Sequence, residues 1–102
     1  MPAMPKRIVK IDLPAPYDCF ACEVWVNIGG EERAAFTEAT NPERFHAAFG
    51  RMVVSHDFCD FDGKPLPPGG DPALYPALPD ELAQLIFRGR AEQVGRLTKS
   101  GT

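Results

Sequence analysis

The stretch Cys19-Phe-Ala-Cys-Glu-Val-Trp-Val-Asn-Ile28 carries the clearest structural signal in this 102-residue chain. Apolar residues recur at every second position, as in a β-strand with one buried face. The side chains expected on that face are Phe20, Cys22, Val24, Val26 and Ile28. Gly29-Gly30 ends the run. The pattern therefore predicts a strand that contributes its even-numbered residues to the core.

A second strand is expected just before the first. Residues 7–13 are rich in β-branched side chains, and the prolines at positions 14 and 16 interrupt the pattern because proline cannot donate to a ladder. The link to Cys19 is too short to hold a crossover helix. The two strands should therefore pair antiparallel, as a hairpin.

Two main helices are predicted further along the chain. Asn41-Pro42 is typical of a helix start, and residues at helical spacing follow it: Phe45, Phe49, Met52, Val53 and His56. We therefore expect a helix from Pro42 to about His56. The last helix should begin near Pro79, where Asp80 and Glu81 suit its positive end.

The segments around these helices predict turns. Asp62-Gly63 is a tight-turn signal, so residues 57–66 should form a short hairpin or hooked loop. Asp71-Pro72 predicts one helical turn that ends near Tyr75. Residues 31–39 fit either a short helix or a mobile loop.

The expected fold is α+β, with a small β-hairpin or sheet packed against two main helices. One domain spans residues 1–102, with flexible tails at 1–5 and 99–102. The chain is 44% hydrophobic and 25% charged, which is typical of globular proteins.

Composition and charge argue against several function classes. No apolar run approaches a bilayer span, and the N-terminus has no signal-peptide h-region, which favours the cytoplasm. Net charge is −3 and basic residues are scattered, which argues against nucleic-acid binding. The absence of a phosphate loop or nucleophile motif favours binding over catalysis.

One metal hypothesis stands beside these predictions. Cys-x-x-Cys and His-x-x-Cys together offer three thiolates and an imidazole, a legitimate zinc set. Its members would be Cys19, Cys22, His56 and Cys59. Strand alternation would point Cys19 and Cys22 to opposite faces, and free cysteines are often buried hydrophobes, so no cofactor is the preferred prediction.

Four residues are candidates for protein contacts. Trp25, Phe61, Leu66 and Tyr75 are aromatic or apolar groups near predicted loops and edges. Large apolar anchors of this kind are common in binding hot spots. Trp25 fits equally well as a core residue.

The order of segments resembles small tail-assembly-chaperone-like proteins of long-tailed bacteriophages and prophages. The resemblance covers about Arg7 to Arg90, and its most specific part is Asp60-Phe-Asp-Gly-Lys-Pro-Leu-Pro67. Leu78-Pro-Asp-Glu-Leu82, which opens the last helix, also matches. His56 stands where such proteins commonly carry tryptophan.

The resemblance implies a non-enzymatic assembly factor in the host cytoplasm. Such chaperones coat the tape-measure protein and are thought to recruit tail-tube subunits, and they are absent from the finished virion. That work needs apolar grooves and weak multivalent contacts. Alternatives are a zinc-stabilised binding module and a structural virion subunit of the tail or connector; self-association is left open.

Overall fold

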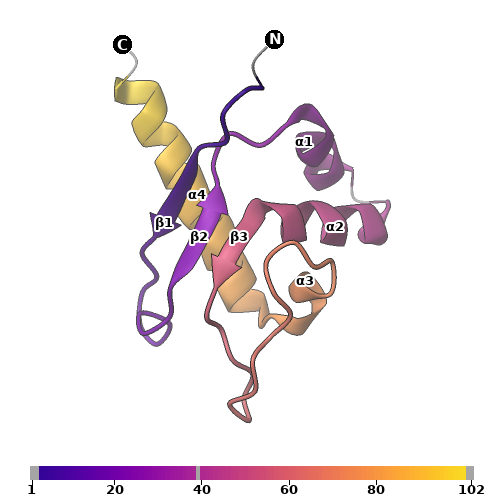
Figure 1. Cartoon of the computed structure of the whole chain (residues 1–102), viewed down its shortest axis with the longest axis vertical. Helices are drawn as coiled ribbons and strands as arrows, with labels where there is room; N and C mark the ends of the chain where they lie inside the picture. Colours follow the sequence, from indigo (N-terminus) through magenta and orange to yellow (C-terminus); the bar gives the residue numbers. More distant parts are fainter. Residues whose placement is uncertain (1–2, 39, 101–102) are drawn as a thin grey trace.

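The predicted α+β class is confirmed by a computed structural model, which describes residues 3–38 and 40–100, the last five by backbone alone. The described residues form a three-stranded antiparallel sheet and four helices (Figure 1). No helix among them is long and apolar enough to cross a bilayer. Of the predicted tails, positions 1–2 and 101–102 lie outside the described residues.

The sheet has the strand order β1-β2-β3, with β1 at Ile8–Ile11, β2 at Cys22–Trp25 and β3 at Val53–His56. The predicted pairing of the first two strands is confirmed, with Ile8 opposite Trp25 and Ile11 opposite Cys22. The predicted alternation also holds. Cys22, Val24, Val26 and Ile28 are buried, and Phe20 packs against the core while partly exposed.

The prediction of a helix from Pro42 to His56 was wrong at its end. Helix α2 spans Pro42–Met52, and the chain then becomes strand β3. The predicted start is confirmed, since the Asn41 side chain accepts a hydrogen bond from the Arg44 backbone N–H at 3.1 Å. The end moves because Val53, Ser55 and His56 pair with β2, an alternative that helical spacing does not reveal.

The remaining helices surround this sheet. Helix α1 spans Gly30–Thr37, so residues 31–37 of the ambiguous segment are helical; Glu38 is the extended C-cap, and position 39 lies outside the described residues. A helical turn is present where one was predicted, but it lies about two residues later, as α3 at Leu74–Ala77; α4 spans Asp80–Ser100. In Figure 1, α4 runs behind the strands, while α1, α2 and α3 lie together to one side.

The edge strand β3 is covered by a later segment of the chain. A Cβ at Gly69 would stand 2.5 Å from the Val53 carbonyl oxygen, so only glycine permits this approach. The Gly70 N–H donates to the Gly50 carbonyl at 2.7 Å, and His56 Nε2 lies 2.7 Å from the Pro67 carbonyl. These contacts hold residues 67–70 against β3 and the last turn of α2.

Candidate functional site

Residues 57–66 form a tight hairpin that protrudes from the body, and we call it the hook. The Asp60 carboxylate accepts hydrogen bonds from the backbone N–H groups of Asp62 and Lys64, each at 2.9 Å. The Asp60 N–H donates to the Lys64 carbonyl at 2.7 Å, and Gly63 supplies the left-handed turn position with a φ of 83°. The predicted hooked loop is confirmed, and its tip is fixed by its own hydrogen bonds.

The loop between β1 and β2 stands opposite the hook. Phe20 holds it in place by packing edge-on against the buried Phe58, with ring centroids 5.4 Å apart. At the base, the Ala21 N–H donates to Asp57 Oδ1 at 2.6 Å, and the Asp57 N–H donates to the Ala21 carbonyl at 3.2 Å. The two loops are therefore joined at their roots and separate above them.

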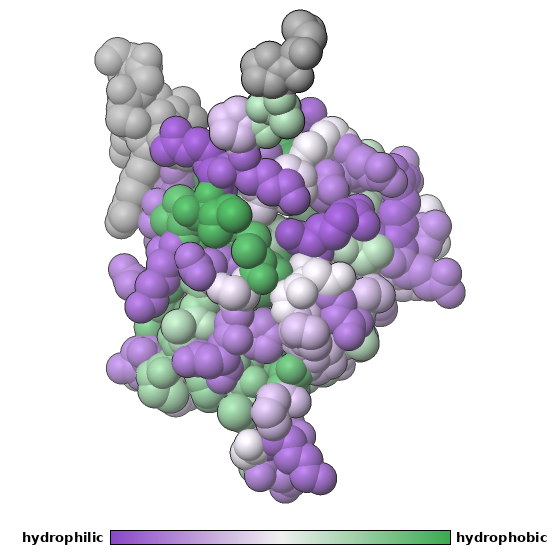
Figure 2. All heavy atoms as spheres, in the orientation of Figure 1, coloured by the Kyte–Doolittle hydropathy of each residue, from purple (hydrophilic) through white to green (hydrophobic). Residues whose placement is uncertain are grey.

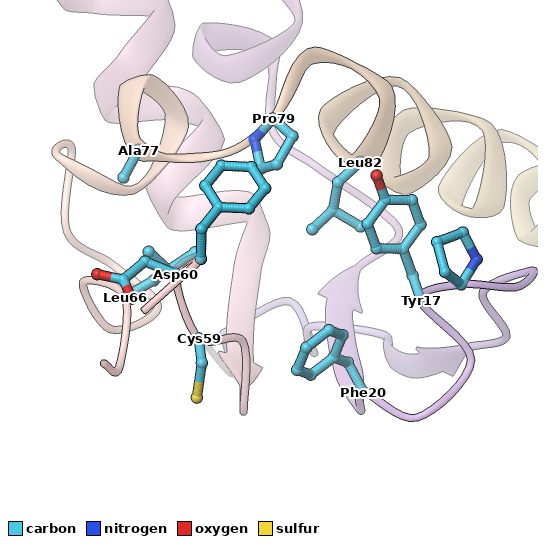
Figure 3. Close-up of a pocket in the computed structure, with 10 residues that line it drawn as sticks. Tyr17, Phe20, Cys59, Asp60, Leu66, Ala77, Pro79 and Leu82 are labelled. Carbon is cyan, nitrogen blue, oxygen red and sulfur yellow. The ribbon is translucent and has the colours of Figure 1, made fainter. Parts of the chain in front are cut away.

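An apolar cavity of about 210 Å³ lies between the two loops, and we call it the hook pocket. Figure 3 shows Tyr17 and Phe20 on one wall, Leu66 and Cys59 on the other, and Leu82 at the start of α4. Its lining comprises Pro16, Tyr17, Phe20, Cys59, Asp60, Phe61, Leu66, Ala77, Pro79 and Leu82. Eight of these ten are apolar or aromatic, so the pocket suits an apolar group.

Phe61 is the most exposed large hydrophobic side chain of the described residues, at 95%. A single exposed apolar residue is ordinary on a protein surface. Phe61 differs because it stands on a fixed turn and also lines an apolar cavity. An aromatic group held ready beside a pocket needs little ordering to make contact, and this is the geometry of a binding anchor.

The predicted contact residues do not share one site. Phe61 and Leu66 meet in the hook pocket, whereas Trp25 and Tyr75 lie elsewhere. Trp25 is partly buried and packs against the hydrophobic core. Its Nε1–H donates to Asn27 Oδ1 at 2.8 Å, and Lys6 Nζ lies 4.6 Å from its ring centroid.

Tyr75 belongs to an aromatic cluster formed by Phe36, Phe45, Phe49, Tyr75 and Phe87. The Tyr75 ring centroid lies 4.8 Å from that of Phe45 and 4.9 Å from that of Phe49. These edge-on contacts join α1, α2, α3 and α4. Tyr75 therefore holds helices together, although one side of it borders a shallow hollow with His46.

Sequence reasoning missed the opposite wall of the hook pocket. Tyr17 lies in a proline-bounded loop, and Leu82 lies in the first turn of α4. Neither residue carries a local pattern that predicts a pocket. The two residues come together because α4 lies beside the β1–β2 hairpin, and no short sequence motif encodes that packing.

The alternative zinc set is not assembled, and this corrects that hypothesis. Cys22 is buried beneath the sheet, where desolvation, with smaller contributions from Asp57 and Glu23, raises the pKa of its thiol to about 12. Cys19 and Cys59 are exposed. The described part of the chain contains no group of three or more His, Cys, Asp or Glu side chains placed to hold a metal ion.

His56 has a structural role in place of the proposed metal binding. Its Nδ1 accepts the Phe58 backbone N–H at 3.0 Å, and its Nε2 faces the Pro67 carbonyl at 2.7 Å. Both ring nitrogens are therefore engaged, as in the neutral tautomer with a proton on Nε2. The ring also stacks on Phe58, with centroids 4.9 Å apart. His56 thereby links β3 to the start of the hook at Phe58 and to Pro67, which directly follows the hook.

Comparisons of this chain with models of protein families, with curated proteins and with solved structures found no match.

Proposed function

We propose that this chain is a non-enzymatic binding protein of phage tail assembly that captures the tape-measure protein in the host cytoplasm. The observation that carries the proposal is Phe61, held at the fixed tip of the hook beside an apolar pocket. An aromatic anchor next to a cavity suits the capture of apolar side chains from another protein.

The sequence resemblance adds a reason for this choice of partner. Its most specific motif, Asp60 to Pro67, coincides with most of the hook and contributes Asp60, Phe61 and Leu66 to the pocket. A tape-measure protein is long and helical, so many copies of a small chaperone can bind along it through weak contacts. The tail-tube subunit is the second proposed partner.

The test is co-expression of this chain with the tape-measure protein of its own genome, followed by measurement of how much tape-measure protein stays soluble and co-purifies. We expect the wild-type chain to retain it, and Phe61→Ser to lower the retained amount at least about tenfold. Met4→Ser is the matched control, because Met4 is 87% exposed at the N-terminal end, away from the hook.

Three results would contradict the proposal. The tape-measure protein could aggregate with or without the chain, or Phe61→Ser and Met4→Ser could retain it equally. The chain could also persist in mature particles, detected by mass spectrometry, which would favour a structural virion subunit. Zinc bound stoichiometrically to the purified chain would instead revive the zinc-stabilised module.

A further inference from the structure

The charge of the molecule is unevenly distributed around the hook pocket. Its walls come from residues 14–20, 57–66 and 77–82, which hold six carboxylates and one lysine: Asp18, Asp57, Asp60, Asp62, Asp80, Glu81 and Lys64. These segments therefore carry a net charge of −5. Since the whole chain carries −3, all other residues together carry +2.

None of these six carboxylates forms an ion pair within the described residues. The two ion pairs formed among those residues are Arg44–Glu38 and Arg51–Glu32. In Figure 2 the protruding hook is mainly hydrophilic, whereas the strongly hydrophobic surface in that view lies over the sheet. An apolar cavity thus opens within an acidic rim.

Tyr17, on one wall of the pocket, lies beside one of these carboxylates, Glu81. Desolvation and the neighbouring Glu81 carboxylate raise the pKa of its phenol above the ordinary value. A negative charge on this phenol is therefore disfavoured, first by desolvation and then by Glu81.

We propose that the hook pocket binds an apolar side chain of a partner segment that carries lysine or arginine on both sides of that residue. This inference rests on the proposed function and specifies the chemistry of the captured segment. The apolar side chain fills the cavity between Tyr17 and Leu66, and the flanking cations lie against Asp18 and Asp62 on the two loops.

The size of the cavity supports one side chain as its occupant. At about 210 Å³ it falls below the roughly 300–1,000 Å³ typical of small-molecule sites. Burial of the apolar group supplies affinity, and the acidic rim supplies selectivity and a faster encounter. An acidic segment would meet like charge on every wall.

Fluorescence anisotropy with labelled peptides provides the test. The first peptide has one leucine between two pairs of lysines; in two matched peptides, the leucine is replaced by serine or the lysines by glutamates. We expect only the first to bind, and its binding should weaken as added salt screens the rim.

Two matched triple variants then test whether the carboxylates beside the pocket are the ones that attract the peptide. Asp18→Asn, Asp62→Asn and Glu81→Gln together remove three exposed carboxylates beside the pocket and bring the net charge from −3 to 0. Glu31→Gln, Glu43→Gln and Glu92→Gln make the same change elsewhere. We expect about tenfold weaker peptide binding for the first triple and less than about twofold for the second.

Several outcomes would overturn the inference. These are binding of the glutamate peptide as tight as that of the lysine peptide, no binding of any peptide, or equal effects of the two triple variants when circular dichroism shows both to be folded. Self-association of the chain that is lost only in the first triple would identify the occupant as a second copy and also overturn it.

Failure of the two proposals can be told apart. Retention of the tape-measure protein that depends on Phe61 but not on the three carboxylates would leave the proposed function standing and remove this inference. Peptide binding with the expected charge dependence, without retention of the tape-measure protein, would remove only the proposed function.

Discussion

Phe61 and Tyr75 are both aromatic residues between α2 and α4, and the sequence presents them as equivalent contact candidates. The structure separates them. Tyr75 packs in the aromatic cluster, with ring centroids of Phe45 and Phe49 within 5 Å, whereas Phe61 is 95% exposed on a turn fixed by Asp60. An aromatic ring that touches other rings stabilises the fold, and one held away from them is free to meet a partner.

The largest effect expected from this comparison is at the centre of the aromatic cluster. Phe49→Ala should lower the free energy of unfolding by about 3–5 kcal/mol, because Phe49 is fully buried and the cavity left behind cannot collapse completely. That is much of the stability of a small domain. Urea denaturation measures it, and a loss below about 1 kcal/mol would show that the cluster is not a structural centre.

Tyr75→Ala should have a smaller effect on stability, about 2 kcal/mol, because the ring is only partly buried. Retention of the tape-measure protein per folded molecule should remain unchanged. Thermal unfolding and co-purification measured together check both parts. If retention of the tape-measure protein fell while stability stayed unchanged, Tyr75 would belong to the contact surface.

The buried Cys22 and the exposed Cys59 allow a similar comparison between two thiols. The folded-state pKa of Cys22, about 12, lies above the ordinary 9.0, so the folded chain holds this proton more tightly than the unfolded chain. The contribution of Cys22 to the free energy of unfolding should therefore stay constant below pH 9.0. It should fall by about 1.4 kcal/mol per pH unit as pH rises from 9.0 toward about 12.

Urea denaturation at several alkaline pH values measures this slope. Cys22→Ala should flatten it, at the cost of some stability at neutral pH from the lost packing. Cys59→Ala, in the exposed hook, is the matched control and should leave it unchanged. Equal slopes in the two variants would mean that another group is responsible.

The smallest effect on stability is expected at Phe61. Phe61→Ser should change the free energy of unfolding by no more than about 0.5 kcal/mol, since the side chain makes few contacts within the chain. Denaturation curves of the two proteins should nearly coincide, while co-purification falls. A destabilisation of 2 kcal/mol would indicate that the ring is part of the fold.

Sequence patterns predicted the features that depend on local interactions and missed those that depend on contacts between residues far apart in the chain. The alternation along β2 and the Asn41 cap are local, and both were predicted correctly. Val53 to His56 was assigned to a helix because its spacing with Phe45 and Phe49 fits one. Only pairing with β2, some thirty residues away, decides for a strand.

The same distinction applies to the candidate site. The Asp62-Gly63 turn and the exposure of Phe61 follow from local chemistry, so half of the hook pocket could be anticipated. The presence of Tyr17 and Leu82 could not be anticipated, because it depends on how the β1–β2 hairpin packs beside α4. The burial of Cys22 removed the zinc hypothesis for a similar reason: its strand turns it inward, away from the other thiols.

The close passage of residues 67–70 over β3 has a consequence for contacts between copies of the chain. Those residues obstruct β3 as an edge to which another chain could add a strand. At the opposite edge, no described strand pairs with the outer side of β1, where the exposed Lys10 provides a charge that discourages strand addition. Salt screens charge but does not move a covering segment. High ionic strength should therefore weaken protection at β1 alone, so that any growth of the sheet by intermolecular strand addition would proceed from that side only.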